Sequence, residues 1–165
     1  MAPSATTVHA AAVLVGARAV LIRGPSGSGK SRLALQLILA ADAGTLRYAR
    51  LVGDDRVYIS AAHGRLLVSP AAALTGLIEV RGLGIRRLPH EPSAVVGLVV
   101  DLAAADAERL PESGAQHAVI AGVNLARLAV AAGFDALPAV LAALTSGRAI
   151  GGRFGAFASA PSAVL

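Results

Sequence analysis

The sequence predicts an α/β protein in which a mixed sheet with flanking helices carries a phosphate-binding loop. Residues 24–31 read Gly-Pro-Ser-Gly-Ser-Gly-Lys-Ser and match G-x-x-x-x-G-K-[ST] at every specified position. An apolar run over 19–22 precedes this loop and a helical spacing of leucines follows it, which is the strand–loop–helix context that the motif requires. A second apolar run, 8–15, is separated from the first by a short turn. The two runs therefore predict an antiparallel hairpin and a sheet of mixed direction.

The other elements follow from apolar spacing and turn residues. We expect further strands over 51–53, 57–61, 65–68, 78–80, 95–102 and 117–120. The valine-rich run 95–102 is expected to be a central strand, and Ala62-His63-Gly64 is expected to form a hairpin turn. One or two helical turns are expected over 71–77. Helices are expected over 30–41, 124–132 and 135–145, the last with Asp135 as N-cap and Pro138 in its first turn.

Composition favours a single domain with a large apolar core. The 165 residues are 55% hydrophobic and 15% charged, so we expect one domain over 1–150 and a flexible tail over 151–165. No apolar run reaches the ~18 residues of a membrane span, and the N-terminus shows no basic, apolar leader, so we expect a cytoplasmic protein without a membrane partner. The arginines are scattered and only 3% of residues are aromatic. We therefore expect no nucleic-acid partner despite the net charge of +5.

The loop over 24–31 has the chemistry of a phosphate cradle. Its glycines let the backbone turn tightly and point successive N–H groups at one anion. Lys30 is the one lysine beside fourteen arginines, and a compact ammonium suits a narrow cradle better than a planar guanidinium. The Ser31 hydroxyl can hold a magnesium ion. The residues expected to bind phosphate are Gly24, Pro25, Ser26, Gly27, Ser28, Gly29, Lys30 and Ser31.

Charged side chains near this loop are the candidates for chemistry on a phosphate group. Asp54 and Asp55 follow the strand over 51–53. Since neighbours on a strand point to opposite faces, we expect one to face the loop, although a solvated hairpin turn would also suit the pair. Glu79 and Arg81 share one face of a strand, so either both project into the site or they pair with each other. His9 lies in the run that leads into the loop, where a lone histidine is usually a core or edge residue.

Together these residues resemble the HPr kinase/phosphorylase family. Val8-His9-Ala10 is similar to the family's histidine-bearing first strand, residues 24–31 to its P-loop, and Asp54-Asp55-Arg56 to its double aspartate before an arginine. The most specific likeness is Glu-Val-Arg-Gly-Leu-Gly-Ile over 79–85, and Glu108-Arg109-Leu110 is a weaker one. The resemblance covers about residues 8–130.

The resemblance implies a P-loop fold of the phosphoenolpyruvate-carboxykinase type. It implies ATP-dependent phosphorylation of a serine on HPr, a phosphocarrier protein of the sugar phosphotransferase system, which many members reverse with inorganic phosphate. Lys30 would hold the transferring phosphate, and Ser31 and Glu79 would bind Mg²⁺. The Asp54–Asp55 pair would supply the base, with His9 in support and Arg109 aiding dephosphorylation; Arg81 joins these catalytic candidates through its position beside Glu79. Family members form hexamers, so a homo-oligomer is expected.

Departures from the family pattern modify these expectations. Longer members carry an additional N-terminal domain, so the sequence resembles the short, α-proteobacterial-type form with the catalytic domain only. Longer members also place a cation-bearing loop, tied to dephosphorylation, before the C-terminal helix. The corresponding residues 120–124 contain no cation, which favours the kinase direction. Two alternatives stay open: a P-loop kinase for a different acceptor, and an ATP-sensing regulatory module with little turnover.

Overall fold

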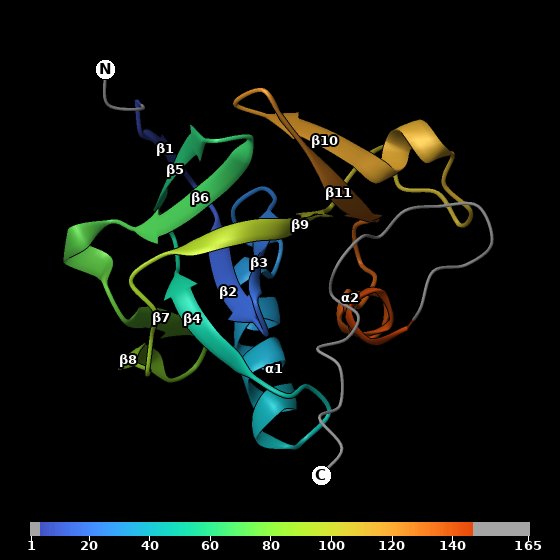
Figure 1. Ribbon diagram of the computed structural model, residues 1–165. Coiled ribbons are helices and arrows are strands. Elements are labelled where there is room, and N and C mark those ends of the chain that lie inside the picture. The colour runs from blue at the N-terminus through green and yellow to red at the C-terminus, as the bar shows by residue number, and fades with distance from the viewer. Residues whose placement is uncertain (1–3, 147–165) are drawn as a thin grey trace, which may run out of the picture.

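A large mixed sheet organises residues 4–146, the part of the chain that the computed structural model describes (Figure 1). Its strands are β1 (Thr6–Val8), β2 (Ala11–Val15), β3 (Arg18–Arg23), β4 (Ala49–Gly53), β5 (Val57–Ala62), β6 (Arg65–Pro70), β9 (Ala94–Leu102), β10 (His117–Ile120) and β11 (Val123–Val130). A separate hairpin consists of β7 (Leu77–Val80) and β8 (Gly84–Arg87). The helices are α1 (Lys30–Asp42) and α2 (Leu137–Thr145), with short 3-10 turns at Ala72–Leu74 and Ser113–Gln116. The expected mixed α/β class is thus confirmed.

Four strands end at one edge of this sheet. β2 runs antiparallel to both β3 and β4, and β9 runs parallel to both β3 and β11. The carboxyl ends of β4, β3, β9 and β11 therefore meet at the same edge, with β4 on one side of β3 and β9 and β11 on the other. The glycine-rich loop leaves β3 at this edge, which is where α/β sheets commonly bind ligands.

The central hairpin is buried on both faces. Because side chains alternate along a strand, Val13 and Ile22 enter a core shared with α1 and α2, whereas Ala12 and Leu21 enter a second core formed by strand residues. Leu21 and Ile22 are completely buried, and burying each such side chain stabilises the fold by about 2 kcal/mol. The loop after β3 therefore starts from a rigid base.

The predicted strand over 8–15 is two strands rather than one. β1 pairs with β5, whereas β2 pairs with β3 and β4. The chain bends at His9 and Ala10 to pass from one pairing to the other. His9 therefore lies at the loop edge of the sheet and not within a strand.

The predicted helix over 124–132 is wrong, since β11 occupies most of it. Leucine and alanine favour helices, but Val123 and Leu125 point into the second core and β11 pairs in parallel with β9. Burial and cross-strand pairing outweigh the local propensity. The strand 117–120 is consequently followed by one more strand, and β8 is a further strand that the sequence did not predict.

The last described helix, α2, corresponds to the prediction over 135–145. Pro138 lies in its first turn as expected. The N-cap position is Ala136 rather than Asp135, although Asp135 Oδ1 accepts the backbone N–H of Leu137 at 3.1 Å. Among the helices within residues 4–146, none is long and apolar enough to cross a membrane. The tail expected over 151–165 lies outside the described residues.

Candidate active site

The glycine-rich loop is held in a tight curve between β3 and α1. A Cβ atom at Gly24 would lie 2.6 Å from Ser28 Oγ and 3.0 Å from the Leu102 carbonyl oxygen, so a side chain would not fit there. Gly29 adopts the left-handed conformation, with φ of 98°, at the N-cap of α1. No side chain caps this helix and its first turn holds no acidic residue. Its first N–H groups are therefore available to an anion.

Lys30 and Ser28 give this loop its polar interior. The side chain of Lys30 is buried, and its Nζ donates to the carbonyl oxygens of Gly24 at 2.9 Å and Pro25 at 3.0 Å. Ser28 Oγ is also buried, and it is without a hydrogen-bond partner among the described residues. An unpaired buried hydroxyl is costly. This hydroxyl faces Gly24 within the loop, so the groups that fit a chain of phosphates are the ammonium of Lys30 and the free N–H groups at the start of α1.

Asp54 is the aspartate that faces the loop. Ser31 Oγ lies 2.8 Å from Asp54 Oδ1 and 2.9 Å from Oδ2, and the backbone N–H of Glu79 donates to Oδ2 at 3.2 Å. Asp54 is only 4% exposed, and these donors compensate for the burial of its carboxylate. Its position fixes the Ser31 hydroxyl at the start of α1.

Asp55 points to a different partner. β4 ends at Gly53, so the two aspartates lie in the turn before β5, and Asp55 has a left-handed φ of 64°. Its Oδ1 lies 2.9 Å from His9 Nε2, and both side chains are more than half exposed. The turn thus directs one carboxylate inward to Ser31 and leaves the other open to solvent.

A cavity of about 630 Å³ brings most of the predicted residues together. It is lined by His9, residues 26–32, Leu35, Asp54, Asp55, Glu79, Val80 and Arg81. Glu79 is exposed on β7, so its carboxylate needs no partner to offset burial. Nor does Glu79 form an ion pair with Arg81 in the described part of the chain. Both side chains therefore remain available to a ligand in the cavity.

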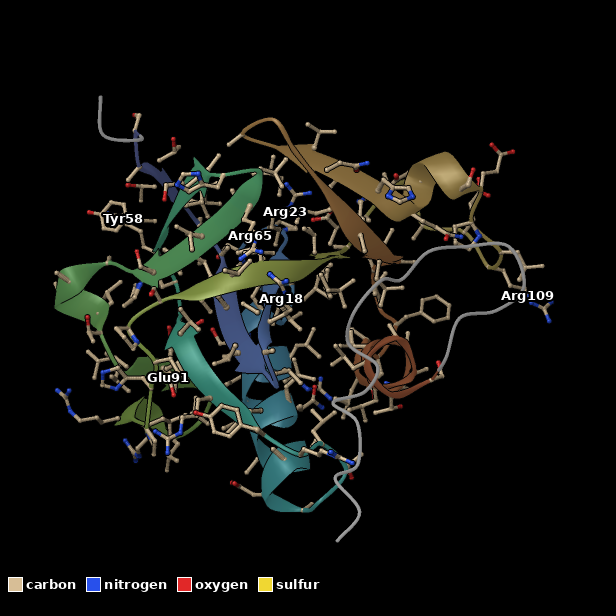
Figure 2. All side chains as sticks on the ribbon, in the orientation of Figure 1. Arg18, Arg23, Tyr58, Arg65, Glu91 and Arg109 are labelled. Carbon is tan, nitrogen blue, oxygen red and sulfur yellow. The ribbon has the colours of Figure 1, made fainter. Side chains whose placement is uncertain are left out.

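Arg109 does not join this group. It is exposed in the segment between β9 and β10 and is not part of the cavity lining. Figure 2 shows its side chain pointing outward, well away from α1. Arg109 therefore lies away from the glycine-rich loop in this structure.

The oxygen atoms around the cavity fit a magnesium ion. Residues 4–146 contain no cluster of three or more His, Asp or Glu side chains with metal-site geometry. Magnesium, however, is usually bound by one or two carboxylates together with phosphate oxygens and waters. Ser31, Asp54 and Glu79 supply a hydroxyl and two carboxylates beside the loop, which is a donor set of this kind.

An ionic network beside the loop was missed by the sequence reasoning. Asp101 on β9 accepts bonds from Arg23 at 2.7 and 2.8 Å and from Arg127 at 2.6 Å. Arg127 also donates to Asp106 at 2.8 and 2.9 Å. The network ties the end of β3, directly before Gly24, to β9, β11 and the segment after β9. The sequence does contain one indication of this network: Asp101 lies inside the apolar run 95–102, and a carboxylate there needs a charged or hydrogen-bonding partner.

We expect Asp101→Asn to destabilise the fold in a pH-dependent way. Partial burial raises the pKa of Asp101, but the hydrogen bonds from Arg23 and Arg127 outweigh it and hold this pKa below its usual range. A carboxylate with a lowered folded pKa stabilises the protein above its unfolded pKa of about 4, and this contribution is lost as the pH falls through the folded value. Urea unfolding should show a loss of roughly 2 kcal/mol near pH 7 and a smaller one near pH 3. Asp42→Asn, at the exposed end of α1, is the control, and an equal loss at both pH values would contradict the assignment.

With this geometry established, comparison with known proteins identifies the family. Residues 1–131 match the model of the HPr serine kinase C-terminal domain, which is well over half of the chain. The chain belongs to this family. The chain is similar to an HPr kinase/phosphorylase of Clostridium tetani (strain Massachusetts / E88), with 43% identity over 84 residues that cover 51% of this chain and 25% of that protein. An HPr kinase/phosphorylase of Streptococcus thermophilus (strain ATCC BAA-491 / LMD-9) is 44% identical over 81 residues, or 48% and 24% of the two chains.

The aligned region is thus about a quarter of the length of these relatives. The likeness to a solved HPr kinase structure is broader. The Hpr(Ser) kinase/phosphatase from Coxiella burnetii matches with a TM-score of 0.66 and 26% identity, over 82% of this chain and 91% of that chain. The mixed α/β fold with a large sheet and few helices is therefore shared with an HPr kinase structure.

Proposed function

We propose that this domain is an ATP-dependent serine kinase that acts on HPr and uses Mg²⁺. One observation carries the proposal: the phosphate loop and the side chains of Asp54, Asp55 and Glu79 line a single cavity. Phosphoryl transfer needs a phosphate cradle, a divalent cation, and a residue that orients or deprotonates the acceptor. HPr as the acceptor is supported by the names of the relatives.

The buried side of the cavity would hold the phosphates. Lys30 and the free N–H groups of α1 would bind them, while Ser31 and Glu79 would ligate Mg²⁺ and Asp54 would hold the Ser31 hydroxyl. The ion would neutralise negative charge on the phosphates. Arg81, on the same wall, would bring a further positive charge to the transferring group.

The exposed side would receive the serine. Asp55 is an accessible carboxylate at 2.9 Å from His9, so it can take the proton from an incoming hydroxyl while His9 fixes its orientation. In the reverse reaction Asp55 would return that proton. The buried Asp54, already bonded to Ser31 and Glu79, is less accessible to the acceptor.

The surface around the cavity favours a protein acceptor over a small molecule. Leu83 and Ile85 on the β7–β8 hairpin are 56% and 65% exposed. Ile85 pairs in register with Glu79, so both lie on the face that borders the cavity. Exposed apolar side chains beside a site commonly mark a protein contact. By family resemblance we further propose a phosphoenolpyruvate-carboxykinase-like P-loop fold, one domain over 1–150, a cytoplasmic location and a homo-oligomer, hexameric as in the family.

The decisive experiment mixes the chain with ATP, Mg²⁺ and HPr from the same organism, and locates the phosphate by mass spectrometry. We expect phosphoserine on HPr and none with the Lys30→Ala variant. Tight ATP binding without transfer would favour the ATP-sensing module, and transfer to another substrate would favour the different acceptor. Inorganic phosphate added to the phosphorylated HPr should reverse the reaction only weakly, since residues 120–124 lack a cation and Arg109 lies away from the loop. Rapid reversal would contradict this preference for the kinase direction.

A further inference from the structure

A second cavity lies on the opposite flank of the glycine-rich loop. It has a volume of about 590 Å³ and is lined by loop residues 25–28, by Arg32 of α1, by Leu102 at the end of β9 and Ala103 after it, and by residues 130–135 around the end of β11. This size is typical of small-ligand sites. We propose that it holds the nucleoside of the phosphate donor, with the base stacked on Phe134. The inference rests on the proposed kinase function and adds the place of the nucleoside to it.

The order of the strands gives the direction of the bound nucleotide. Asp54 and Asp55 follow β4, on one side of β3, whereas the second cavity lies over the ends of β9 and β11 on the other side. In Figure 1, β7 and β8 with the end of β4 lie to the left of α1, and the end of β11 with α2 lies to the right. The reacting phosphate must lie beside Ser31 and the carboxylates. A phosphate chain that crosses the loop therefore carries its nucleoside toward β9 and β11.

Ser28 lies where the two cavities meet. Ser26, Gly27 and Arg32 line both cavities together with it. This end of the loop therefore borders the path of a polar group that passes from one cavity to the other. The oxygens of a phosphate chain would accept hydrogen bonds from the loop N–H groups and from Arg32 along this path.

Phe134 is placed as a stacking surface. Its side chain is 76% exposed, and its backbone N–H donates to the Ala131 carbonyl at 3.2 Å across a turn that includes Gly133 in a left-handed conformation. The aromatic ring is thus presented by a fixed turn at the cavity. The neighbouring carboxylate of Asp135 already accepts the N–H of Leu137. The accessible ring of Phe134, with the apolar side chains of Leu102 and Val130 in the same lining, suits a flat nucleobase, which stacks on aromatic side chains.

Tryptophan fluorescence and binding measurements test this placement. The chain contains no tryptophan, so Phe134→Trp introduces a single reporter in the cavity. We expect magnesium–ATP to quench it and magnesium–tripolyphosphate, which has no nucleoside, to leave it unchanged. Leu110→Trp, at a position that is 84% exposed and outside both cavity linings, should respond to neither. By calorimetry, Phe134→Ala should weaken ATP roughly tenfold and leave tripolyphosphate affinity unchanged, whereas Phe134→Tyr should bind both normally.

The outcomes separate this inference from the proposed kinase. If ATP binds in a Lys30-dependent manner but equally well to Phe134→Ala, and the fluorescence of the Phe134→Trp variant does not respond, the nucleoside lies elsewhere and the kinase proposal stands. If Phe134→Ala weakens the binding of ATP and of tripolyphosphate equally, the inference is also overturned. Such a result would mean that the substitution disturbs the phosphate loop and does not remove a contact with the base. If the wild-type chain binds neither compound, both proposals fail.

Discussion

Lys30→Ala is expected to lower the rate of HPr phosphorylation by ~10²–10³-fold or more and to weaken ATP binding in parallel. The buried ammonium bridges the carbonyl oxygens of Gly24 and Pro25. Its removal takes away both the positive charge at the phosphates and the cross-link that holds the loop closed. Calorimetry with ATP and a rate assay with HPr would measure the two effects separately.

Two exchanges between lysine and arginine extend this test: Lys30→Arg changes the shape of the cation in the loop, and Arg65→Lys is the control. Lys30→Arg is expected to lose nearly as much activity, because a planar guanidinium does not fit where a compact ammonium lies between two carbonyl groups. Arg65→Lys, at the exposed start of β6, should leave binding and transfer unchanged. A folded Lys30→Ala variant that keeps full activity would contradict the proposed function.

The features that the sequence predicts well are those fixed by local geometry. The motif over 24–31 constrains a strand, a loop and a helix start within a few residues, and the structure has α1 beginning at Lys30. Short turns at 16–17 and 63–64 likewise fix the β2–β3 and β5–β6 hairpins. In each case the interactions that decide the structure lie close together in the chain.

The features that were missed depend on partners far away in the sequence. β11 has helix-forming residues, yet it becomes a strand because β9 pairs with it. Asp101 has no partner nearby in the chain, and its arginines come from β3 and β11. The spacing of Asp54 and Asp55 likewise predicts divergent side chains but not which one meets Ser31. That assignment comes only from the way the turn before β5 packs on α1.

The divergence of this pair leads to the second large expected effect. Asp55→Asn should keep ATP binding and lose transfer by ~10²–10⁴-fold, the usual contribution of a general base. Asp55 is exposed beside His9, and the Ser31 hydroxyl is bonded to Asp54 instead, so an amide at position 55 should not disturb the phosphate loop. His9→Gln, which retains a donor for Asp55, should lose less activity than His9→Ala.

Asp54→Asn should instead weaken the binding of magnesium–ATP. Its carboxylate accepts the Ser31 hydroxyl on both oxygens and the Glu79 N–H on one, and an amide would set a donor against these donors. Titrating Mg²⁺ at fixed ATP should show a higher requirement in Asp54→Asn and a normal one in Asp55→Asn. If Asp54→Asn binds magnesium–ATP normally but transfers no phosphate, while Asp55→Asn remains active, the base is Asp54 and the two roles are reversed. The two single variants thus test whether Asp55 takes the proton while Asp54 supports magnesium–ATP binding. The opposite orientations of the two side chains in the turn favour this division.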